Sequence, residues 1–245
     1  MERKKPVIQI KSFLLLISFI LSSCVTINEN QSSSEEKVSI NLRLGTEYLK
    51  QGRMENALNY FQKALSEDSD SYITHLMLAE VHKRLGNFSQ AEIYFQKAID
   101  NVPNNSSEYG IVHNNFGVYL CTKGLLEQAE QHFLNAAKHK MYVTPSAAYE
   151  NAALCAVKQN KQQAEIYFRK ALALNATQQR SLLEMAKLQF AQQNYLETRR
   201  YILQFHAIAK ATPESMKIDI ELKQILGNKT SSDKLNIKPN SRKPN

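Results

Sequence analysis

The stretch LGTEYLKQGRMENALNYFQKA at residues 44–64 returns as LAEVHKRLGNFSQAEIYFQKA at residues 78–98, a shift of 34 positions. Both copies have a small residue second, a Gly ninth and the ending Ala-x-x-x-Phe-x-x-Ala. The three defined positions of that ending lie on one face of a helix, because residues i, i+4 and i+7 point the same way. A period of this length predicts a solenoid of stacked helix pairs.

Three further copies extend the pattern along the chain. After a four-residue insertion it continues as Phe116-Gly117, Ala129, Phe133 and Ala136, then as Ala152-Ala153, Ala164, Phe168 and Ala171, and more weakly as Met185-Ala186, Ile202 and Phe205. The series resembles the tetratricopeptide (TPR) consensus, with its small residue at position 8, Ala at 20, aromatic at 24 and Ala at 27. The resemblance implies an all-α TPR superhelical solenoid of antiparallel helix pairs.

The repeat boundaries predict about five repeats and a C-terminal capping helix in a TPR domain over residues 38–228. The repeats fall at about 38–71, 72–105, 110–143, 145–178 and 179–212, with a half repeat at 213–228. The helices are expected at about 39–51, 54–66, 72–85, 88–101, 108–123, 126–139, 145–158, 161–174, 179–192, 195–209 and 214–226. Gly52, Gly86 and Gly124 should end their helices in left-handed geometry, a role expected to pass to Asn160 and Asn194 in later repeats.

The first residues predict an export signal. A basic start at Arg3, Lys4 and Lys5 precedes an apolar run at 13–20, and Leu21-Ser22-Ser23-Cys24 follows. Small residues before a Cys at this place resemble a bacterial lipobox, which implies that residues 1–23 are a lipoprotein signal peptide and that Cys24 is the lipidated N-terminus. The alternative is an ordinary signal peptide with an incidental Cys. Without Asp after that Cys, the expected location is the outer membrane, lipid-anchored and facing the periplasm, with 24–37 as a flexible tether.

Charge and composition exclude several classes of function. The net charge is +8, but most of this positive charge lies in the first 23 residues and in 229–245. We expect residues 229–245 to form a disordered basic tail. Because the body is nearly neutral, we expect no nucleic-acid partner. With seven Gly, no phosphate-binding loop, no nucleophile elbow and no HExxH, the chain is expected to be no enzyme and to take no cofactor or small-molecule substrate. His75 with His82, and His132 with His139, are seven apart, which favours packing over metal binding.

Two cysteines remain if Cys24 is lipidated. Cys121 and Cys155 lie in the first helices of the third and fourth repeats, which pack side by side in a TPR stack. Their Cα atoms could then come within the separation of about 4.4–6.8 Å that a disulfide requires. The alternative is two small buried apolar residues, since free Cys is often buried.

The first two repeats carry apolar residues at positions that line the inner groove of a TPR superhelix. We expect a partner groove made by Leu42, Thr46, Leu49, Ile73, Leu76, Glu80 and Lys83. An apolar strip rimmed by charge favours a bound peptide or helix. The alternative is that the tether or tight curvature covers these side chains.

The local sequence of repeats three to five resembles the PilF/PilW family of type IV pilus biogenesis lipoproteins. The segments that carry this resemblance are 114–121, NNFGVYLC, and 151–155, NAALC, with EMA at 184–186 and YLETRRY at 195–201. The resemblance implies a pilotin, which binds subunits of the pilus secretin and promotes their outer-membrane localisation and multimerisation. It also implies that Cys121 and Cys155 are the family's paired cysteines. The alternative function is a general periplasmic TPR scaffold for cell-wall or outer-membrane assembly enzymes.

Overall fold

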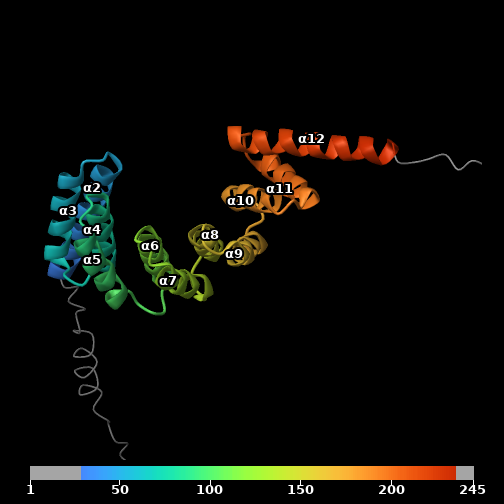
Figure 1. Ribbon diagram of the computed structural model, residues 1–245. Helices are drawn as coiled ribbons and strands as arrows, with labels where there is room; N and C mark the ends of the chain where they lie inside the picture. The colour runs from blue at the N-terminus through green and yellow to red at the C-terminus, as the bar shows by residue number, and fades with distance from the viewer. Residues whose placement is uncertain (1–28, 236–245) are drawn as a thin grey trace, which may run out of the picture.

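The computed structural model describes residues 29–235, and in that range it contains helices and no strand (Figure 1). The helices are α2 (Glu29–Lys50), α3 (Met54–Glu67), α4 (Tyr72–Arg84), α5 (Phe88–Asn101), α6 (Glu108–Thr122), α7 (Leu126–Lys138), α8 (Pro145–Ala156), α9 (Lys161–Leu174), α10 (Gln179–Ala191), α11 (Tyr195–Ile208) and α12 (Pro213–Leu235). They pack as successive pairs from α2·α3 to α10·α11, with α12 on the last pair. The all-α TPR solenoid predicted from the sequence is confirmed, and most helix ends lie within two residues of their expected places.

The repeated small and aromatic residues explain how each pair holds together. Ala57, Phe61 and Ala64 of α3 are fully buried, and the same three positions are buried in α5, α7 and α9. A methyl group on Gly45 of α2 would lie only 2.5 Å from the Phe61 ring, so the two helix axes approach closely because Gly45 has no side chain. Most of the buried apolar residues from repeat two to α12 form one continuous cluster.

Aromatic side chains carry the core across the insertion between the second and third repeats. The Phe95 ring lies 5.3 Å from the Phe116 ring and 5.1 Å from the Tyr119 ring, between centroids. The Tyr119 hydroxyl donates a hydrogen bond to the Phe88 carbonyl oxygen at 2.8 Å. The stack therefore continues through Pro103–Ser107 without losing contact between the repeats.

The turns within the repeats agree with the sequence at the glycines and differ at the asparagines. Gly52, Gly86 and Gly124 have φ between 74° and 77°. Asn160 and Asn194 have negative φ and precede their helices instead, and the Asn160 side chain accepts a hydrogen bond from the Gln163 amide. The expected left-handed role of both asparagines is wrong. Gln193 takes it in repeat five, with φ of 61°, and the turn of repeat four is too short to need it.

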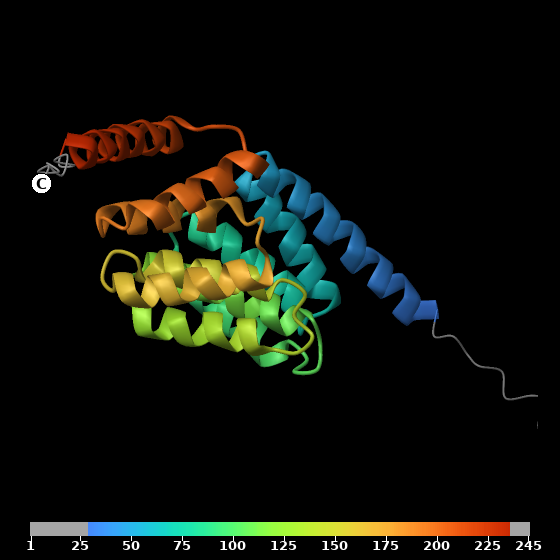
Figure 2. The ribbon, with the colours of Figure 1, turned by 90° about the vertical axis from the view of Figure 1, so that its right-hand side faces the viewer.

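The first helix is longer than expected. The helix α2 starts at Glu29, so the segment 29–37 is helical where the sequence predicted part of a flexible tether. Its first turns project beyond the rest of the solenoid (Figure 2). The Ser34 hydroxyl donates to the Glu67 carbonyl oxygen at 3.2 Å, and the Lys37 ammonium lies 3.6 Å from the Glu67 carboxylate. These contacts hold the extension against the end of α3.

The last helix is also longer than expected. The helix α12 continues to Leu235, nine residues past the predicted end, so the expected disordered tail is helical over 229–235. The rest of that tail, 236–245, and the predicted signal peptide and lipidation site Cys24 lie outside the described residues. Within residues 29–235, no helix has the length and apolar character needed to cross a membrane.

Candidate partner-binding surface

A hollow with an apolar floor lies in the first repeat, where α2 passes the end of α3. It has a volume of about 480 Å³ and is lined by Ser34, Glu35, Val38, Ser39, Leu42, Glu67 and Asp68. Val38 and Leu42 are half-buried and lie four residues apart, so they form an apolar strip along one face of α2. The hollow exists because α2 extends to residue 29, which supplies its outer wall.

Carboxylates surround this apolar floor. Glu35 and Asp68 are exposed, and the Glu67 carboxylate forms an ion pair with the Lys37 ammonium. Asp68 also accepts a hydrogen bond from the Asp70 amide, so the loop after α3 holds its carboxylate at the rim. A surface of this kind fits an apolar side chain that is flanked by Lys or Arg. Sequence reasoning missed these residues, because Glu35 was assigned to the tether, Val38 preceded the first predicted helix, and Glu67 and Asp68 were assigned to a helix end.

The structure places the predicted groove residues in different environments. Leu49 and Leu76 are only 6% and 7% exposed, and each belongs to a buried cluster. Their expected place on an open groove is wrong: Leu49 belongs to the cluster that contains Phe61 and Leu78, and Leu76 to the cluster that contains Ala91 and Phe95. Leu42 is half-buried and Ile73 is 40% exposed, so these two remain accessible to a partner.

The polar members of the predicted groove are engaged within the solenoid. Glu80 forms ion pairs with Lys83 and with Arg84, the latter at 2.7 Å. The Arg84 guanidinium also donates to the Leu49 carbonyl oxygen at 3.3 Å and so ties α4 to the end of α2. The Thr46 hydroxyl donates to the carbonyl oxygen of Leu42 in its own helix at 2.7 Å. The hollow at the start of α2 is therefore the more accessible part of the first two repeats.

A disulfide joins the third and fourth repeats. Cys121 near the end of α6 and Cys155 near the end of α8 are bonded, with their Cα atoms 5.8 Å apart. Nearby, the Asn151 amide donates to the Asn114 side-chain oxygen at 3.0 Å. These two links bind the first helices of neighbouring repeats directly to each other.

His113, which sequence reasoning missed, is buried in α6 and pairs with the half-buried His132 of α7. The Nδ1 atoms of His113 and His132 lie 2.9 Å apart, which requires one ring to donate and the other to accept. Burial, with smaller contributions from His132 and His139, lowers the pKa of His113 to about 4. Burial also lowers the pKa of His132. The pair is a neutral packing element at physiological pH.

His82 packs against an aromatic ring, in agreement with the packing role predicted from the sequence. The ring of His82 stacks on Tyr94 with centroids 5.4 Å apart, and burial lowers its pKa. Among residues 29–235, no group of three or more His, Cys, Asp or Glu side chains is placed to hold a metal ion.

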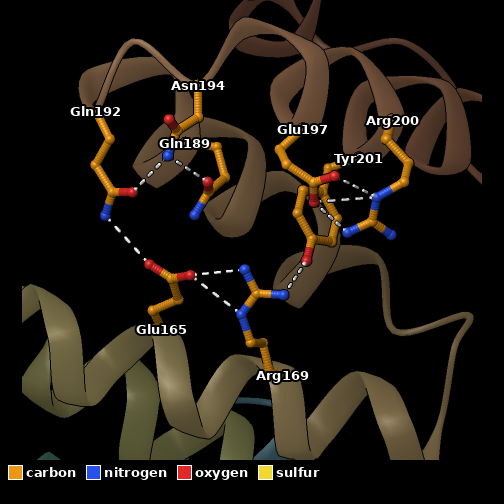
Figure 3. A network of polar contacts seen from close by, with 8 residues as sticks. All are labelled: Glu165, Arg169, Gln189, Gln192, Asn194, Glu197, Arg200 and Tyr201. Atoms are coloured by element: carbon orange, nitrogen blue, oxygen red, sulfur yellow. Dashed lines mark hydrogen bonds and ion pairs between the residues drawn. The ribbon is translucent and has the colours of Figure 1, made fainter.

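A polar network joins the second helices of repeats four and five (Figure 3). Glu165 of α9 pairs with Arg169 at 2.7 Å and accepts a hydrogen bond from Gln192 at 3.2 Å. Arg169 reaches the Tyr201 hydroxyl of α11 at 3.5 Å. The network fixes α11 on α9, and its charged members are neutralised within it.

Comparison of the chain with known proteins identifies its relatives. The model of the tetratricopeptide repeat family matches residues 48–112. The type IV pilus assembly protein PilF of Pseudomonas aeruginosa is 29% identical over 220 residues, which cover 87% of this chain and 86% of PilF. An uncharacterized protein of Haemophilus influenzae is 30% identical over 60% of this chain and 80% of its own length. The chain is homologous to PilF.

Solved structures agree with this homology to PilF. The structure of Pseudomonas aeruginosa PilF superposes with a TM-score of 0.71 at 28% identity, covering 82% of this chain and 90% of that one. The structure of PilW, a type IV pilus biogenesis factor, superposes with a TM-score of 0.66 at 22% identity, covering 80% and 89%, and shows the shared fold. The resemblance seen in the sequence is thus confirmed as homology to PilF and as a shared fold.

Proposed function

We propose that this protein acts in type IV pilus biogenesis as an outer-membrane lipoprotein without catalytic activity. In this role it is a pilotin: it binds subunits of the pilus secretin in the periplasm and promotes their outer-membrane localisation and multimerisation. The relationship to PilF supports the pilus role. The observation that carries the binding role is the acid-rimmed apolar hollow between α2 and α3.

The place of the hollow fits a protein anchored through Cys24. Glu29 is five residue steps from Cys24, which limits their distance to about 18 Å even in a fully extended chain. The nine helical steps from Glu29 to Val38 add only about 14 Å. A secretin segment bound at Val38 would therefore lie within about 32 Å of the lipid anchor, close to the membrane that it must enter.

The binding role can be tested with a charge placed on the floor of the hollow. In a strain lacking this protein, the wild-type gene should restore secretin multimers, and Val38→Glu should not, because a carboxylate would replace the apolar floor among other carboxylates. Ile93→Glu is the matched control, since Ile93 is 48% exposed on α5 and lies outside the hollow. Both variants should retain wild-type helicity and melting temperature.

Two results would contradict the proposal. If Val38→Glu restores secretin multimers as well as Ile93→Glu does, the partner uses another surface. If secretin multimers form equally well without this protein, and purified secretin does not bind to it, the pilotin role is wrong. Purified peptidoglycan enzymes or outer-membrane assembly proteins that bind at Val38 would then favour the general scaffold.

A further inference from the structure

The repeats show which face of each second helix holds the next repeat. On α9 this face carries Glu165, which accepts from Gln192, and Arg169, which reaches Tyr201 (Figure 3). One repeat earlier, Glu130 of α7 occupies the same place and accepts hydrogen bonds from Tyr167 and from Gln163, the latter at 3.4 Å. In both repeats a polar or charged face is covered by the helix that follows.

The matching face of α11 is apolar and uncovered. A shift of 34 residues converts Glu165 to Arg199 and Arg169 to Leu203. Leu203 is 57% exposed and Leu196, on the same stripe, is 77% exposed, the highest exposed fraction of any large apolar side chain in 33–227. Arg199 is exposed and forms no ion pair with another described residue. The last repeat therefore presents an uncovered surface, formed by Leu196, Arg199 and Leu203, on which another helix can pack. We call this surface the seat.

The helix α12 forms the other wall of this seat. Its Ile218 and Leu222 are buried on the solenoid, but Met216 and Ile220 are 46% and 56% exposed. Between the helices lies a hollow of about 390 Å³, lined by Arg199, Leu203, His206, Asp219, Leu222, Lys223, Leu226 and Gly227. The C-terminal half of α12 projects past α11, so this wall is open to another molecule (Figure 1).

We propose that a second copy of this chain occupies the seat, in a two-fold dimer in which Met216 and Ile220 of one copy pack on Leu196 and Leu203 of the other. The two exposed pairs lie on α11 and α12, which pack against each other, so each copy can supply both halves of this contact. It also carries both signs of charge, because Asp219 lies 2.7 Å from Lys223 at the rim and can accept Arg199 of the second copy.

Charge disfavours residues 236–245 of the same chain as the occupant of the seat. Residues 236–245 contain Lys238, Arg242 and Lys243 and no acidic residue. They would enter a seat that already has Arg199 and Lys223 on its rim. A second copy instead covers the exposed end of each solenoid with the other, which is the usual requirement for the terminal repeat of a stacked array.

The dimer can be tested by sedimentation equilibrium of the full chain in detergent. The wild-type chain should show a monomer–dimer equilibrium, and Leu203→Glu should raise its dissociation constant about a hundredfold, because the charge enters a two-fold contact twice. Ile166→Glu is the matched control, since Ile166 is 46% exposed on α9 outside the patch, and it should dimerise like the wild type. In the double variant Leu203→Cys/Ile220→Cys, a short bismaleimide should link the two copies.

Each alternative gives a different result. A wild-type chain that is monomeric at every concentration overturns the proposal. A dimer that Leu203→Glu leaves intact, or that the cysteine pair fails to cross-link, places the contact elsewhere and also overturns it. If the wild type is monomeric and deletion of 236–245 makes Leu203→Cys react faster with a maleimide, the tail covers the seat. None of these results depends on secretin, so they leave the pilotin proposal to its own test.

Discussion

Removal of the disulfide should destabilise the middle of the solenoid by a predictable amount. Cys121 and Cys155 close a loop of 34 residues. The chain-entropy estimate for a loop of that length is about 4 kcal/mol of stabilisation, acting through the unfolded chain. For a protein of 150–250 residues, each kcal/mol shifts the melting temperature by about 2–4 °C, so reduction should lower it by about 8–15 °C.

The measurement compares thermal unfolding by circular dichroism with and without a phosphine reductant. The double variant Cys121→Ala/Cys155→Ala should melt close to the reduced wild type and should not respond to the reductant. Repeat proteins are stabilised mainly between neighbours, so hydrogen exchange should increase first in α6 to α9. A reduced wild type that melts within about 2 °C of the oxidised protein would refute the reasoning, since the loop closure would then contribute little.

Three further changes test separate features. Gly45→Ala should destabilise the protein by about 1–3 kcal/mol, because its methyl group meets Phe61. The matched change Gly227→Ala, in an open part of α12, should stabilise the protein by about 0.5–1 kcal/mol. Urea unfolding measures both changes, and equal effects would contradict the packing argument. The pKa of His113 is about 4 in the fold, below the ordinary histidine value of 6.5, so the free energy of unfolding should be constant above about pH 6.5 and fall by about 3 kcal/mol as the pH drops to 4. A pH series with His113→Leu should show a smaller loss, and an unchanged slope would exclude His113 as its source. Gln193→Gly should raise the free energy of unfolding by about 0.5–1 kcal/mol, since glycine adopts the φ of 61° without a Cβ clash, and a loss of stability would show that the Gln side chain matters more than the backbone.

The helix pairs could be predicted well from the sequence because each repeat carries several local sequence signals for the same structure. Gly at the turn, Ala at the crossing and Phe in the gap are separate signals that agree with one another, as in Gly52, Ala57 and Phe61. Gln193 shows the limit of those signals. A neighbouring Asn was a better intrinsic candidate for left-handed geometry, but the register of the two helices decides which residue stands at the turn.

The site was harder to predict because exposure depends on neighbours far along the chain. Leu49 and Leu76 stand at groove positions of the repeat, yet each is buried in a cluster that includes residues of other helices. Residues 29–38 show no apolar period, and their helix is held in place by contacts with Glu67 more than thirty positions away. Local composition cannot report such contacts, so the hollow around Val38 was not expected.

The two proposed surfaces lie at opposite ends of the stack, which makes them separable. A solenoid transmits stability mainly between adjacent repeats, and the disulfide lies between the repeats that separate the ends. Val38→Glu and Leu203→Glu share no contact, so their effects on stability should add within about 0.5 kcal/mol. If secretin binding at Val38 were lost when Leu203→Glu breaks the dimer, the two ends would have to be coupled through the assembly itself: a single copy would then be too weak a binder, and two hollows acting together would supply the affinity. A double-mutant comparison of secretin binding distinguishes these cases, because independent surfaces predict normal binding by the Leu203→Glu monomer.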